Sequence, residues 1–444
     1  MCLSHSSKFA HVTEQRGYNR AMRVYLDSVG CRLNQSEMER IGAQLRVAGF
    51  ELVADAADAE WVILNTCAVT AEAASDSRGK ARQAARLGAK VVLTGCWATL
   101  DAQAAAALPG VVRVVGNDGK ERLVSEVFDL PTEVFDQEPL AREPLPGLHQ
   151  RTRAFIKAQD GCDHHCTYCI TRLARGRARS VPLAQVLSDV QAALRGGVKE
   201  VVLSGVQLGA WGSELLPRQR LRDLVSGVLH GCAVPRLRLS SVEPWDVDED
   251  LLGLWAGQPR LCRHLHLPLQ SGCAATLRRM GRKGSPEAFA ALLEQARRLV
   301  PQMAITTDLI VGFPGETEEE FAESLDFVRA MRFAGGHVFT YSARPGTPAA
   351  SLPNPVHGRV ARQRGAQMRA VLAEAAATYR QQFIGQQAEV LWEAAKACGP
   401  QGWQMSGLTD TYVRVEGWLP EPRWNELQSV RLVAGHGEAL LAEF

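Results

Sequence analysis

The feature that most constrains the fold is a regular alternation of short apolar segments with longer amphipathic ones. Between residues 22 and 128, four segments are short and rich in valine and isoleucine, as buried strands are: MRVYLDSVG, WVILNTC, KVVLTGC and VVRVVGN. Two helices are predicted between them, over QSEMERIGAQLRVAG and over TAEAASDSRGKARQAARLG, the second with Thr70 as its N-cap. This pattern predicts an N-terminal domain built on an open parallel α/β sheet.

The alternation resumes with a longer period between residues 149 and 382. Six further strands are predicted there: AFIKAQ, KEVVLSG, RLRLSS, HLHLPLQSG, MAITTDLIVGF and GGHVFTYS. Helices separate most of them, one capped by Ser285 with Pro286 at its first position and another capped by Thr317. Six such units predict a partial (β/α)6 barrel, with its active-site groups on the loops that follow the strands.

Three other segments complete the predicted domain organisation. Residues 1–21 lack the apolar core and cleavage site of a secretory signal and are expected to be a disordered extension, and residues 129–148 form a proline-rich linker. Residues 383–444 contain the short strands AEVLWE, TYVRVEG, SVRLVAG and EALLAEF, which predict a small β-barrel. Its aromatic residues suit either a core or a surface that stacks on RNA bases: Trp392, Trp403, Tyr412, Trp418 and Trp424.

Composition narrows the class of protein further. The 444 residues carry a net charge of only +2, and no apolar run approaches the ~18 residues that indicate a membrane span. Eleven cysteines without a secretory signal point to a cytoplasmic protein whose thiols serve metal binding or catalysis rather than disulfides.

Three of these cysteines lie within eight residues, in the segment GCDHHCTYCI. Cys162, Cys166 and Cys169 supply three thiolates, and a structural zinc site needs four protein ligands. His164 and His165 are poorly placed to be the fourth, because so tight a loop cannot easily fold its own interior back onto the ion. Three thiolates instead suit three irons of a [4Fe–4S] cluster, with the fourth iron open to another ligand.

Three further cysteines share one context in the N-terminal domain. Cys31, Cys67 and Cys96 each follow a predicted strand. Because ligands of an open parallel sheet gather beyond the carboxyl ends of its strands, we expect these thiols to meet at one edge and to share a ligand.

The spacing of Cys162, Cys166, Tyr168 and Cys169 resembles the signature of the radical S-adenosylmethionine (SAM) superfamily. GCRLNQSEME, NTCAVT and LTGCWA resemble the three N-terminal cysteine motifs of its methylthiotransferases. Four further segments resemble core segments of the same family: RLSSVEP, HLHLPLQSGC, TTDLIVGFPGETEEEF and VFTYSARPGTPA. The C-terminal barrel is similar to an RNA-binding TRAM domain. The likeness extends from Met22 to Phe444.

This resemblance implies two [4Fe–4S] clusters, one on Cys31, Cys67 and Cys96 and the other on Cys162, Cys166 and Cys169. It implies that one SAM methylates a sulfur atom at the first cluster and that a second SAM supplies a radical that activates the substrate carbon. The SAM contacts that it implies are Ser204, Gly205, Glu243, Gln270 and Gly312, although the family's usual Gly-Gly-Glu appears here only as LSGVQ. An electron donor such as flavodoxin or ferredoxin and an unidentified sulfur source are also implied.

The motifs GCRLNQSE and SSVEP resemble the branch that adds a methylthio group to C2 of N6-threonylcarbamoyladenosine beside the tRNA anticodon. The alternatives are isopentenyladenosine in tRNA, an aspartate of a ribosomal protein, and, in another class, a non-catalytic zinc and RNA-binding protein. Residues 151–180 carry seven basic and two acidic side chains. Arg172, Arg175, Arg177 and Arg179 are therefore expected either to attract tRNA phosphates or to form a solvated arm.

Overall fold

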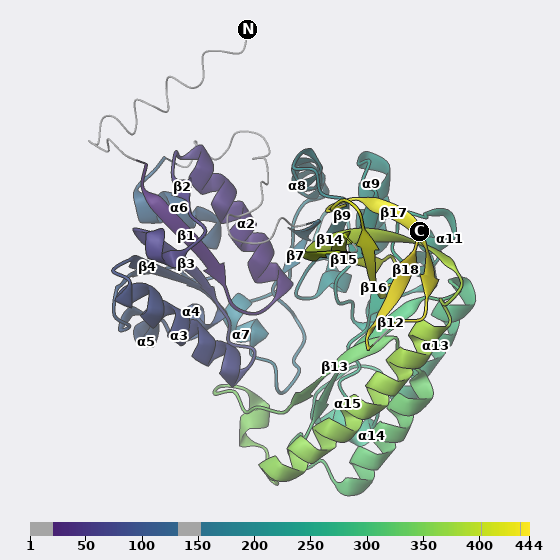
Figure 1. Cartoon of the computed structure of the whole chain (residues 1–444). Helices are drawn as coiled ribbons and strands as arrows, with labels where there is room; N and C mark the ends of the chain where they lie inside the picture. The colour runs from purple at the N-terminus through teal and green to yellow at the C-terminus, as the bar shows by residue number, and fades with distance from the viewer. Residues whose placement is uncertain (1–20, 132–151, 401, 436) are drawn as a thin grey trace. The chain divides into compact units, whose positions relative to one another are not determined.

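The computed structural model describes residues 21–131, 152–400, 402–435 and 437–444 (Figure 1). All but the last residue of the predicted N-terminal extension, and all but three residues of the predicted linker, lie outside them. The chain divides into two compact units. The N-terminal unit comprises Met1–Gln150, Ile170–Gly176 and Gln191–Gly196, and the core unit comprises Arg151–Cys169, Arg177–Val190 and Gly197–Phe444.

A five-stranded parallel sheet forms the centre of the N-terminal unit, as predicted. Its strand order is β2-β1-β3-β4-β5. The strands are β1 (Arg23–Ser28), β2 (Glu51–Leu52), β3 (Trp61–Thr66), β4 (Lys90–Gly95) and β5 (Val111–Val114). Strand β2 was not predicted, because two residues at a sheet edge are too few to show a period-two pattern.

Helices cover both faces of this sheet. They are α2 (Arg32–Val47), α3 (Ala71–Arg86), α4 (Cys96–Leu100), α5 (Ala102–Ala106) and α6 (Leu123–Phe128). Helices α2 and α6 pack on the face that carries Ile63, whereas α3, α4 and α5 pack on the face that carries Leu64. Thr70 caps α3 as predicted, since its Oγ1 accepts a hydrogen bond from the Ala73 amide at 3.0 Å.

The core unit contains the six predicted strands as two parallel sheets, β10-β9-β6 and β11-β12-β13. The strands are β6 (Arg153–Lys157), β9 (Glu200–Ser204), β10 (Arg236–Leu239), β11 (His264–His266), β12 (Ala304–Val311) and β13 (Gly335–Thr340). Isolated bridges from Leu237 to Leu261 and from Ser241 to His266 join the two sheets. The six strands therefore follow one another in chain order, which confirms the partial barrel.

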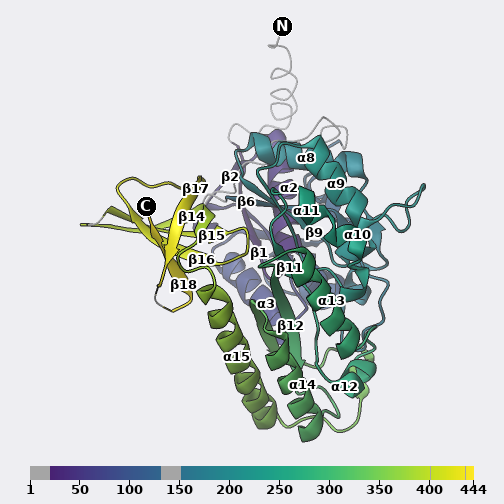
Figure 2. The same cartoon turned by 90° about the vertical axis from the view of Figure 1, so that its right-hand side faces the viewer.

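Helices of the core unit lie alongside these sheets, as Figure 2 shows for α13, α14 and α15. The longer ones are α8 (Leu183–Arg195), α9 (Leu221–Gly231), α13 (Pro286–Leu299), α14 (Glu318–Met331) and α15 (Gly358–Gln381). The short elements are β7 (Gln159–Asp160), β8 (Arg179–Ser180), α10 (Glu249–Leu252), α11 (Leu254–Gly257) and α12 (Ala274–Arg279). Helix α7 (Thr171–Arg175), which lies between β7 and β8 in sequence, belongs to the N-terminal unit. Ser285 and Thr317 cap α13 and α14 as predicted. In the described part of the chain, no helix has the length and apolarity needed to span a membrane.

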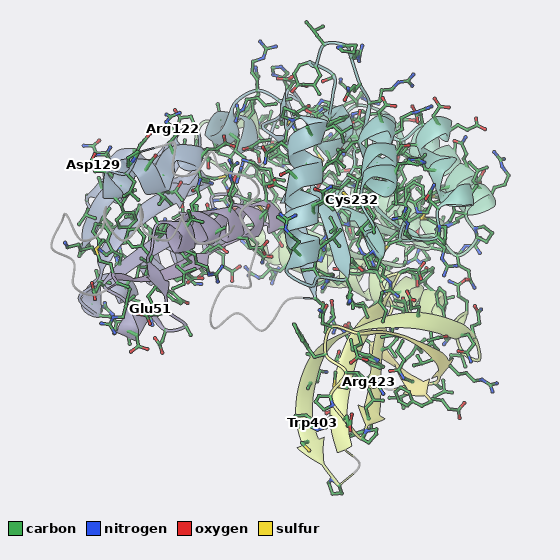
Figure 3. All side chains as sticks on the ribbon, turned by 90° about the horizontal axis from the view of Figure 1, so that it is seen from above. Glu51, Arg122, Asp129, Cys232, Trp403 and Arg423 are labelled. Carbon is green, nitrogen blue, oxygen red and sulfur yellow. The ribbon has the colours of Figure 1, made fainter. Side chains whose placement is uncertain are left out.

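The C-terminal strands close into a barrel in the order β14-β15-β16-β18-β17. The strands are β14 (Gln387–Gly399), β15 (Gly402–Thr409), β16 (Arg414–Leu419), β17 (Leu427–Val433) and β18 (Ala439–Glu443). Four of them match the prediction, and β15 was missed. Trp392 is fully buried in the barrel core, whereas Trp418 is 40% exposed. Trp403 and Arg423 also lie on this barrel (Figure 3).

The barrel packs on the core near the starts of the core strands. Tyr412 stacks on the His264 ring with 4.9 Å between centroids, and the Arg238 guanidinium lies 4.8 Å from the Tyr412 ring. Arg263 donates hydrogen bonds of 2.7 and 3.2 Å to the two carboxylate oxygens of Asp410. His264 is the first residue of β11, so the barrel lies at the end of the strands opposite to the loops that carry the predicted chemistry.

Candidate functional site

The structure brings the three N-terminal cysteines to one edge of the sheet. Cys31 follows β1 and is the N-cap residue of α2, Cys67 follows β3, and Cys96 begins α4 directly after β4. Strands β1, β3 and β4 are neighbours in the sheet. The expectation that these three thiols lie together is confirmed, and their role as cluster ligands stays a prediction.

Glycines precede two of these cysteines in a conformation that other residues rarely adopt. Gly30 has a φ of +99° and Gly95 a φ of +95°. A Cβ atom on Gly30 would lie 2.5 Å from the Cys67 sulfur, and one on Gly95 would collide with the Thr66 carbonyl oxygen. Both glycines thus allow the close approach of the loops.

Two asparagine side chains connect the cysteine loops within the N-terminal unit. The Asn34 amide donates hydrogen bonds to the carbonyl oxygens of Val29 and Thr66 at 2.8 and 3.3 Å, which joins the Cys31 and Cys67 loops. The Asn117 amide lies 3.8 Å from the Cys96 sulfur and donates a hydrogen bond of 2.7 Å to the Ala174 carbonyl oxygen. These contacts fix the backbone that carries the thiols.

The three sulfurs are close enough to influence one another's ionisation. Burial raises the pKa of the Cys67 thiol to about 11, and Cys31 and Cys96 raise it further as like charges. Desolvation also raises the pKa of Cys31, which the Arg175 guanidinium opposes. The thiols of Cys31 and Cys67 therefore keep their protons near neutral pH, and iron binding would release those protons.

A buried ion-pair network lies beside this triad. Glu37 accepts a hydrogen bond of 2.6 Å from the Lys120 ammonium and one of 2.9 Å from the Arg175 guanidinium. The three side chains are only 2–5% exposed. Arg175 also donates a hydrogen bond of 2.7 Å to Asn34 Oδ1, and Asn34 is the residue that joins the cysteine loops. The network thus supports the backbone around Cys31.

The sequence analysis did not find this network. Glu37 lies in the motif GCRLNQSEME, on the buried side of α2. A carboxylate at a buried helix position is rare unless it is paired, and this was the one signal in the sequence that pointed to the network. The partners of Glu37, Lys120 and Arg175, come from distant segments of the chain. Arg175 lies on α7, which follows the cysteine loop of the core unit in sequence but belongs to the N-terminal unit.

Arg175 was therefore wrongly grouped with the arginines expected either to attract phosphate or to form a solvated arm. Arg177 and Arg179 do have exposed side chains, at 87% and 54%, and pair with Asp163 and Asp160 at 3.6 and 3.9 Å. Arg172 is also exposed. Three of the four arginines thus lie on the surface.

The second cysteine loop lies in the core unit after β6 and β7, and hydrogen bonds hold it at both ends. At its start, Gly161 has a φ of +71°, and its carbonyl oxygen accepts a hydrogen bond of 2.9 Å from the Gln159 amide. Near its end, Thr167 donates to the Met280 carbonyl oxygen through its amide at 2.9 Å and to the Arg279 carbonyl oxygen through Oγ1 at 2.8 Å. The loop is thereby held between β6 and the segment that follows α12.

Cys162, Cys166 and Cys169 also interact through their charges. Burial raises the pKa of Cys162 to about 11, with Cys169 and Cys166 adding to the shift as like charges. Burial likewise raises the pKa of Cys166, whereas the Arg282 guanidinium lowers it. The three thiols thus form a second set of neighbouring sulfurs.

One histidine of this loop packs against its neighbours and the other lies on the surface. His164 is half-buried, its Nε2 lies 2.8 Å from the Gln207 amide nitrogen, and its ring packs edge-on against Trp245 at 5.2 Å. His165 is exposed. Tyr168, the aromatic residue of the motif, packs edge-on against Phe313, two residues after the end of β12, and belongs to the apolar cluster around Met280, Phe313 and Ala349.

Of the predicted SAM contacts, Glu243 lies beside the cysteine loop. Arg282 donates hydrogen bonds of 3.0 and 2.8 Å to the two Glu243 carboxylate oxygens, and the same guanidinium affects Cys166. Arg282 was missed by the sequence analysis, since a basic residue in the exposed-looking RRMGRKGS segment carries no distinctive signal.

The other four predicted SAM contacts have backbone or packing roles that the structure explains. Gly205 packs against Gln159, and the Ser204 hydroxyl donates to the Val202 carbonyl oxygen at 3.2 Å. Gln270 has a φ of +72° and pairs with β12 through its backbone. Gly312, also at +72°, leaves no room for a Cβ atom, which would lie 2.6 Å from the Ala361 Cβ. Their role in binding SAM stays a prediction.

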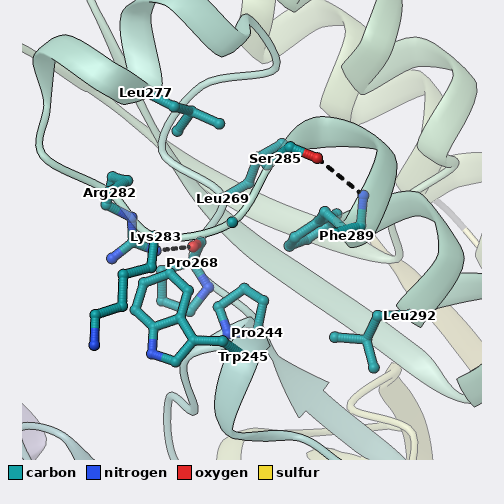
Figure 4. Close-up of a pocket in the computed structure, with 12 residues that line it drawn as sticks. Pro244, Trp245, Pro268, Leu269, Leu277, Arg282, Lys283, Ser285, Phe289 and Leu292 are labelled. Atoms are coloured by element: carbon teal, nitrogen blue, oxygen red, sulfur yellow. Dashed lines mark hydrogen bonds between the residues drawn. The ribbon is translucent and has the colours of Figure 1, made fainter.

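A small cavity lies beside Arg282 (Figure 4). Its walls include Trp245, Leu269, Lys283 and Phe289, and the Arg282 guanidinium lies 4.7 Å from the centre of the Trp245 ring. The cavity holds about 80 Å³, well below the ~300 Å³ of a typical ligand site. It is therefore too small for SAM.

Asp246, next to Trp245, leads to a prediction about how the stability of the protein depends on pH. Burial, with a smaller contribution from Glu243, raises the pKa of this carboxyl from 3.8 to about 6. The folded protein therefore holds this proton more tightly than the unfolded chain, and stability falls as pH rises from 3.8 through about 6. We expect Asp246→Asn to raise the free energy of unfolding by about 1–3 kcal/mol at pH 8, and by roughly half as much at pH 5. Urea denaturation at both pH values measures this, and an equal effect at both would contradict the assignment.

The donor chemistry of both triads fits a thiolate-bound iron–sulfur cluster. Each triad consists of three thiols that influence one another electrostatically. Within the residues that the structure describes, no three His, Cys, Asp or Glu side chains are arranged to hold a single metal ion.

Known proteins resemble this chain in both sequence and fold. Residues 156–328 match the family described as the Radical SAM superfamily, and residues 23–116 match Uncharacterized protein family UPF0004. The threonylcarbamoyladenosine tRNA methylthiotransferase MtaB of Thermotoga maritima is 35% identical over 94% of this chain and 96% of its own length. The tRNA-2-methylthio-N(6)-dimethylallyladenosine synthase of Cereibacter sphaeroides is 31% identical over 95% and 98%, respectively.

Among solved structures, the radical S-adenosylmethionine methyltransferase TsrM of Kitasatospora setae has the same fold, with a TM-score of 0.57 at 17% identity. The match covers 74% of this chain and 75% of TsrM. Because the sequence relatives are enzymes, the alternative of a non-catalytic zinc and RNA-binding protein is wrong. The chain belongs to the radical SAM tRNA methylthiotransferases, which are transferases that use SAM and [4Fe–4S] clusters.

Proposed function

We propose that this enzyme adds a methylthio group to C2 of N6-threonylcarbamoyladenosine next to the tRNA anticodon, with two [4Fe–4S] clusters and two molecules of SAM. The observation that carries the proposal is the presence of two separate sets of three neighbouring thiols, one in each unit of the chain. Three thiolates leave one iron of a cubane open, and methylthio transfer requires two such positions.

When bound, the clusters would supply the electron for SAM cleavage and a position for the transferred sulfur. Cys162, Cys166 and Cys169 would hold one cluster and Cys31, Cys67 and Cys96 the other. Arg282 places a positive charge beside Cys166, and Arg175 places one near Cys31. Both cations favour the thiolate form that iron requires. Flavodoxin or ferredoxin is the proposed class of electron donor.

The names of the relatives support tRNA as the substrate, and they divide between two modified nucleosides of tRNA. Threonylcarbamoyladenosine enzymes of Thermotoga maritima, Bacillus subtilis and Chlamydia pneumoniae are 33–35% identical to this chain, and dimethylallyladenosine enzymes are 31–35% identical. The motifs GCRLNQSE and SSVEP favour the first group. The surface arginines Arg172, Arg177 and Arg179 suit contact with tRNA phosphates.

Mass spectrometry of tRNA nucleosides from a strain that lacks the gene tests this proposal. We expect 2-methylthio-N6-threonylcarbamoyladenosine to be absent, its unmethylthiolated precursor to accumulate, and both to return to normal when the gene is restored. Loss of the methylthio-dimethylallyl nucleoside instead would assign the enzyme to the alternative tRNA substrate. Unchanged tRNA would contradict methylthio transfer to tRNA.

A further inference from the structure

Three rings lie in a row on one face of the sheet formed by β11, β12 and β13. His266 and His337 have ring centroids 6.1 Å apart, and His337 and Phe339 have theirs 6.3 Å apart. We call these three residues the ring row. His337 and Phe339 are two residues apart on β13, so both side chains project from the same side of the strand.

The ring row lies on the face of the sheet opposite to α15. A Cβ atom on Gly336, which directly precedes His337, would lie 3.1 Å from the Leu372 side chain of α15. Side chains alternate along a strand, so His337 and Phe339 project away from that helix. They therefore line the inner face of the partial barrel.

One carboxylate holds both imidazoles of the row. Asp308 lies beside His337 in the register of β12 and β13. Its two oxygens lie 3.1 Å from His266 Nε2 and 3.0 Å from His337 Nδ1. These hydrogen bonds lower the pKa of the Asp308 carboxyl strongly, against the burial that raises it. The carboxylate thus stays charged and fixes the orientation of both rings.

The open part of the row is aromatic. The His337 side chain is 69% exposed and Phe339 is 43% exposed, whereas the His266 side chain is only 11% exposed. The exposed part of the Phe339 ring is not packed against other side chains and is open to a ligand. The pair of His337 and Phe339 is well suited to the face of a flat heterocycle, because aromatic side chains on open strands stack on unpaired bases.

The same face leads directly to the cysteine loop. Ile310, two residues after Asp308 on β12, is paired with Phe339 in register, and it packs against the same apolar cluster of Met280, Phe313 and Ala349 as Tyr168 of the cysteine motif. Two residues along a strand span roughly 7 Å. The ring row therefore begins beneath the loop of Cys162, Cys166 and Cys169, within the core unit.

We propose that the ring row binds the adenine of the target nucleoside, with Phe339 stacked on the base and His337 contacting its N6 substituent. The inference rests on the proposed function, since it takes its ligand from tRNA. A protonated imidazole would pair with the carboxylate of a threonylcarbamoyl group and has no comparable partner in a dimethylallyl group. SAM also contains adenine, but its predicted contacts Gln270 and Gly312 lie on the loops after the strands rather than on this face.

Steady-state kinetics of the reconstituted enzyme with anticodon stem-loop RNA test the stacking. We expect Phe339→Ala to raise KM for the RNA by about 10-fold to 100-fold, because one base–aromatic stack is lost. Phe339→Tyr keeps an aromatic ring, so its KM should stay close to that of the wild type. The matched control is Leu299→Ala, which removes an exposed apolar side chain at the end of α13. The SAM dissociation constant of each variant is measured in parallel.

The histidine is tested by substrate preference. His337→Gln, assayed with RNA that carries either the threonylcarbamoyl or the dimethylallyl nucleoside, should lower the preference for the first by about tenfold. An unchanged KM for RNA in Phe339→Ala overturns the stacking, and a larger effect on SAM binding than on RNA assigns the row to SAM instead. If the wild-type enzyme modifies neither RNA, the proposed function fails rather than the ring row.

Discussion

Replacing Cys162 by alanine is expected to abolish both SAM cleavage and methylthio transfer, whereas replacing Cys67 by alanine should abolish only the transfer. The reason is the separation of the two triads, which lie in different units of the chain. Cys67 is 3% exposed and lies with Cys31 and Cys96 at the edge of the N-terminal sheet, while Cys162 belongs to the core loop. Loss of one thiolate from either set would leave too few ligands for the cluster that we propose there, and the other set would be unaffected.

Anaerobic reconstitution followed by iron analysis measures how much iron each variant binds and so tests whether the two triads act independently. We expect about eight irons per chain in the wild type and about four in each variant. 5′-Deoxyadenosine should form with Cys67→Ala and not with Cys162→Ala. Transfer should fall at least a thousandfold in both.

Cys232→Ala is the matched control, because Cys232 is a buried thiol (Figure 3) at the end of α9, outside both triads. It should keep about eight irons and full activity. If Cys67→Ala also retained all its iron, the N-terminal triad would not hold a cluster.

The positions of the triads were predictable because strand topology determines them. Neighbouring parallel strands end at the same edge of a sheet, so the residues after β1, β3 and β4 had to meet once the alternation was recognised. The capping residues Thr70, Ser285 and Thr317 were equally clear, since a cap depends only on the residues of the first helical turn.

Features that depend on close approach between distant segments were not predictable in the same way. Strand β15 contains Gly402 and Gly407, whose missing side chains admit the neighbouring backbone at Leu419 and Leu391. Glycines normally weaken a strand signal, so the segment was missed. Here they serve the closure of the barrel, which no local pattern reveals.

The ring row was missed for a related reason. Its histidines come from two different strands, and their common partner Asp308 lies on a third. Each histidine alone is unremarkable in sequence. Only the register of β11, β12 and β13 places the three residues together.

Glu37→Gln is expected to lower the free energy of unfolding of the N-terminal unit by about 3–5 kcal/mol near pH 7. Glu37 is the shared partner of Lys120 and Arg175, and all three side chains are buried. The substitution keeps the shape of the side chain but removes its charge. Two cations then remain buried without the negative charge of Glu37, which costs far more than the loss of a surface ion pair.

The effect should depend on pH with a definite sign. Burial lowers the pKa of Lys120, and Glu37 now opposes that shift. Without Glu37 the pKa falls further, so the folded variant releases the Lys120 proton more readily than the unfolded chain does. Stability of the variant therefore rises with pH, and the difference from the wild type should shrink between pH 7 and pH 10.

Chemical denaturation across this range, followed by tryptophan fluorescence, measures both predictions. Asp27→Asn is the matched control, since it breaks the partly exposed pair with Lys80 at 2.6 Å and should cost less than about 1 kcal/mol. A cost for Glu37→Gln no greater than that of the control would show that the network contributes little. The structure argues otherwise, because Arg175 also holds Asn34, and Asn34 joins the loops of Cys31 and Cys67. We therefore expect the destabilised variant to lose iron from the N-terminal triad before it loses iron from the core loop.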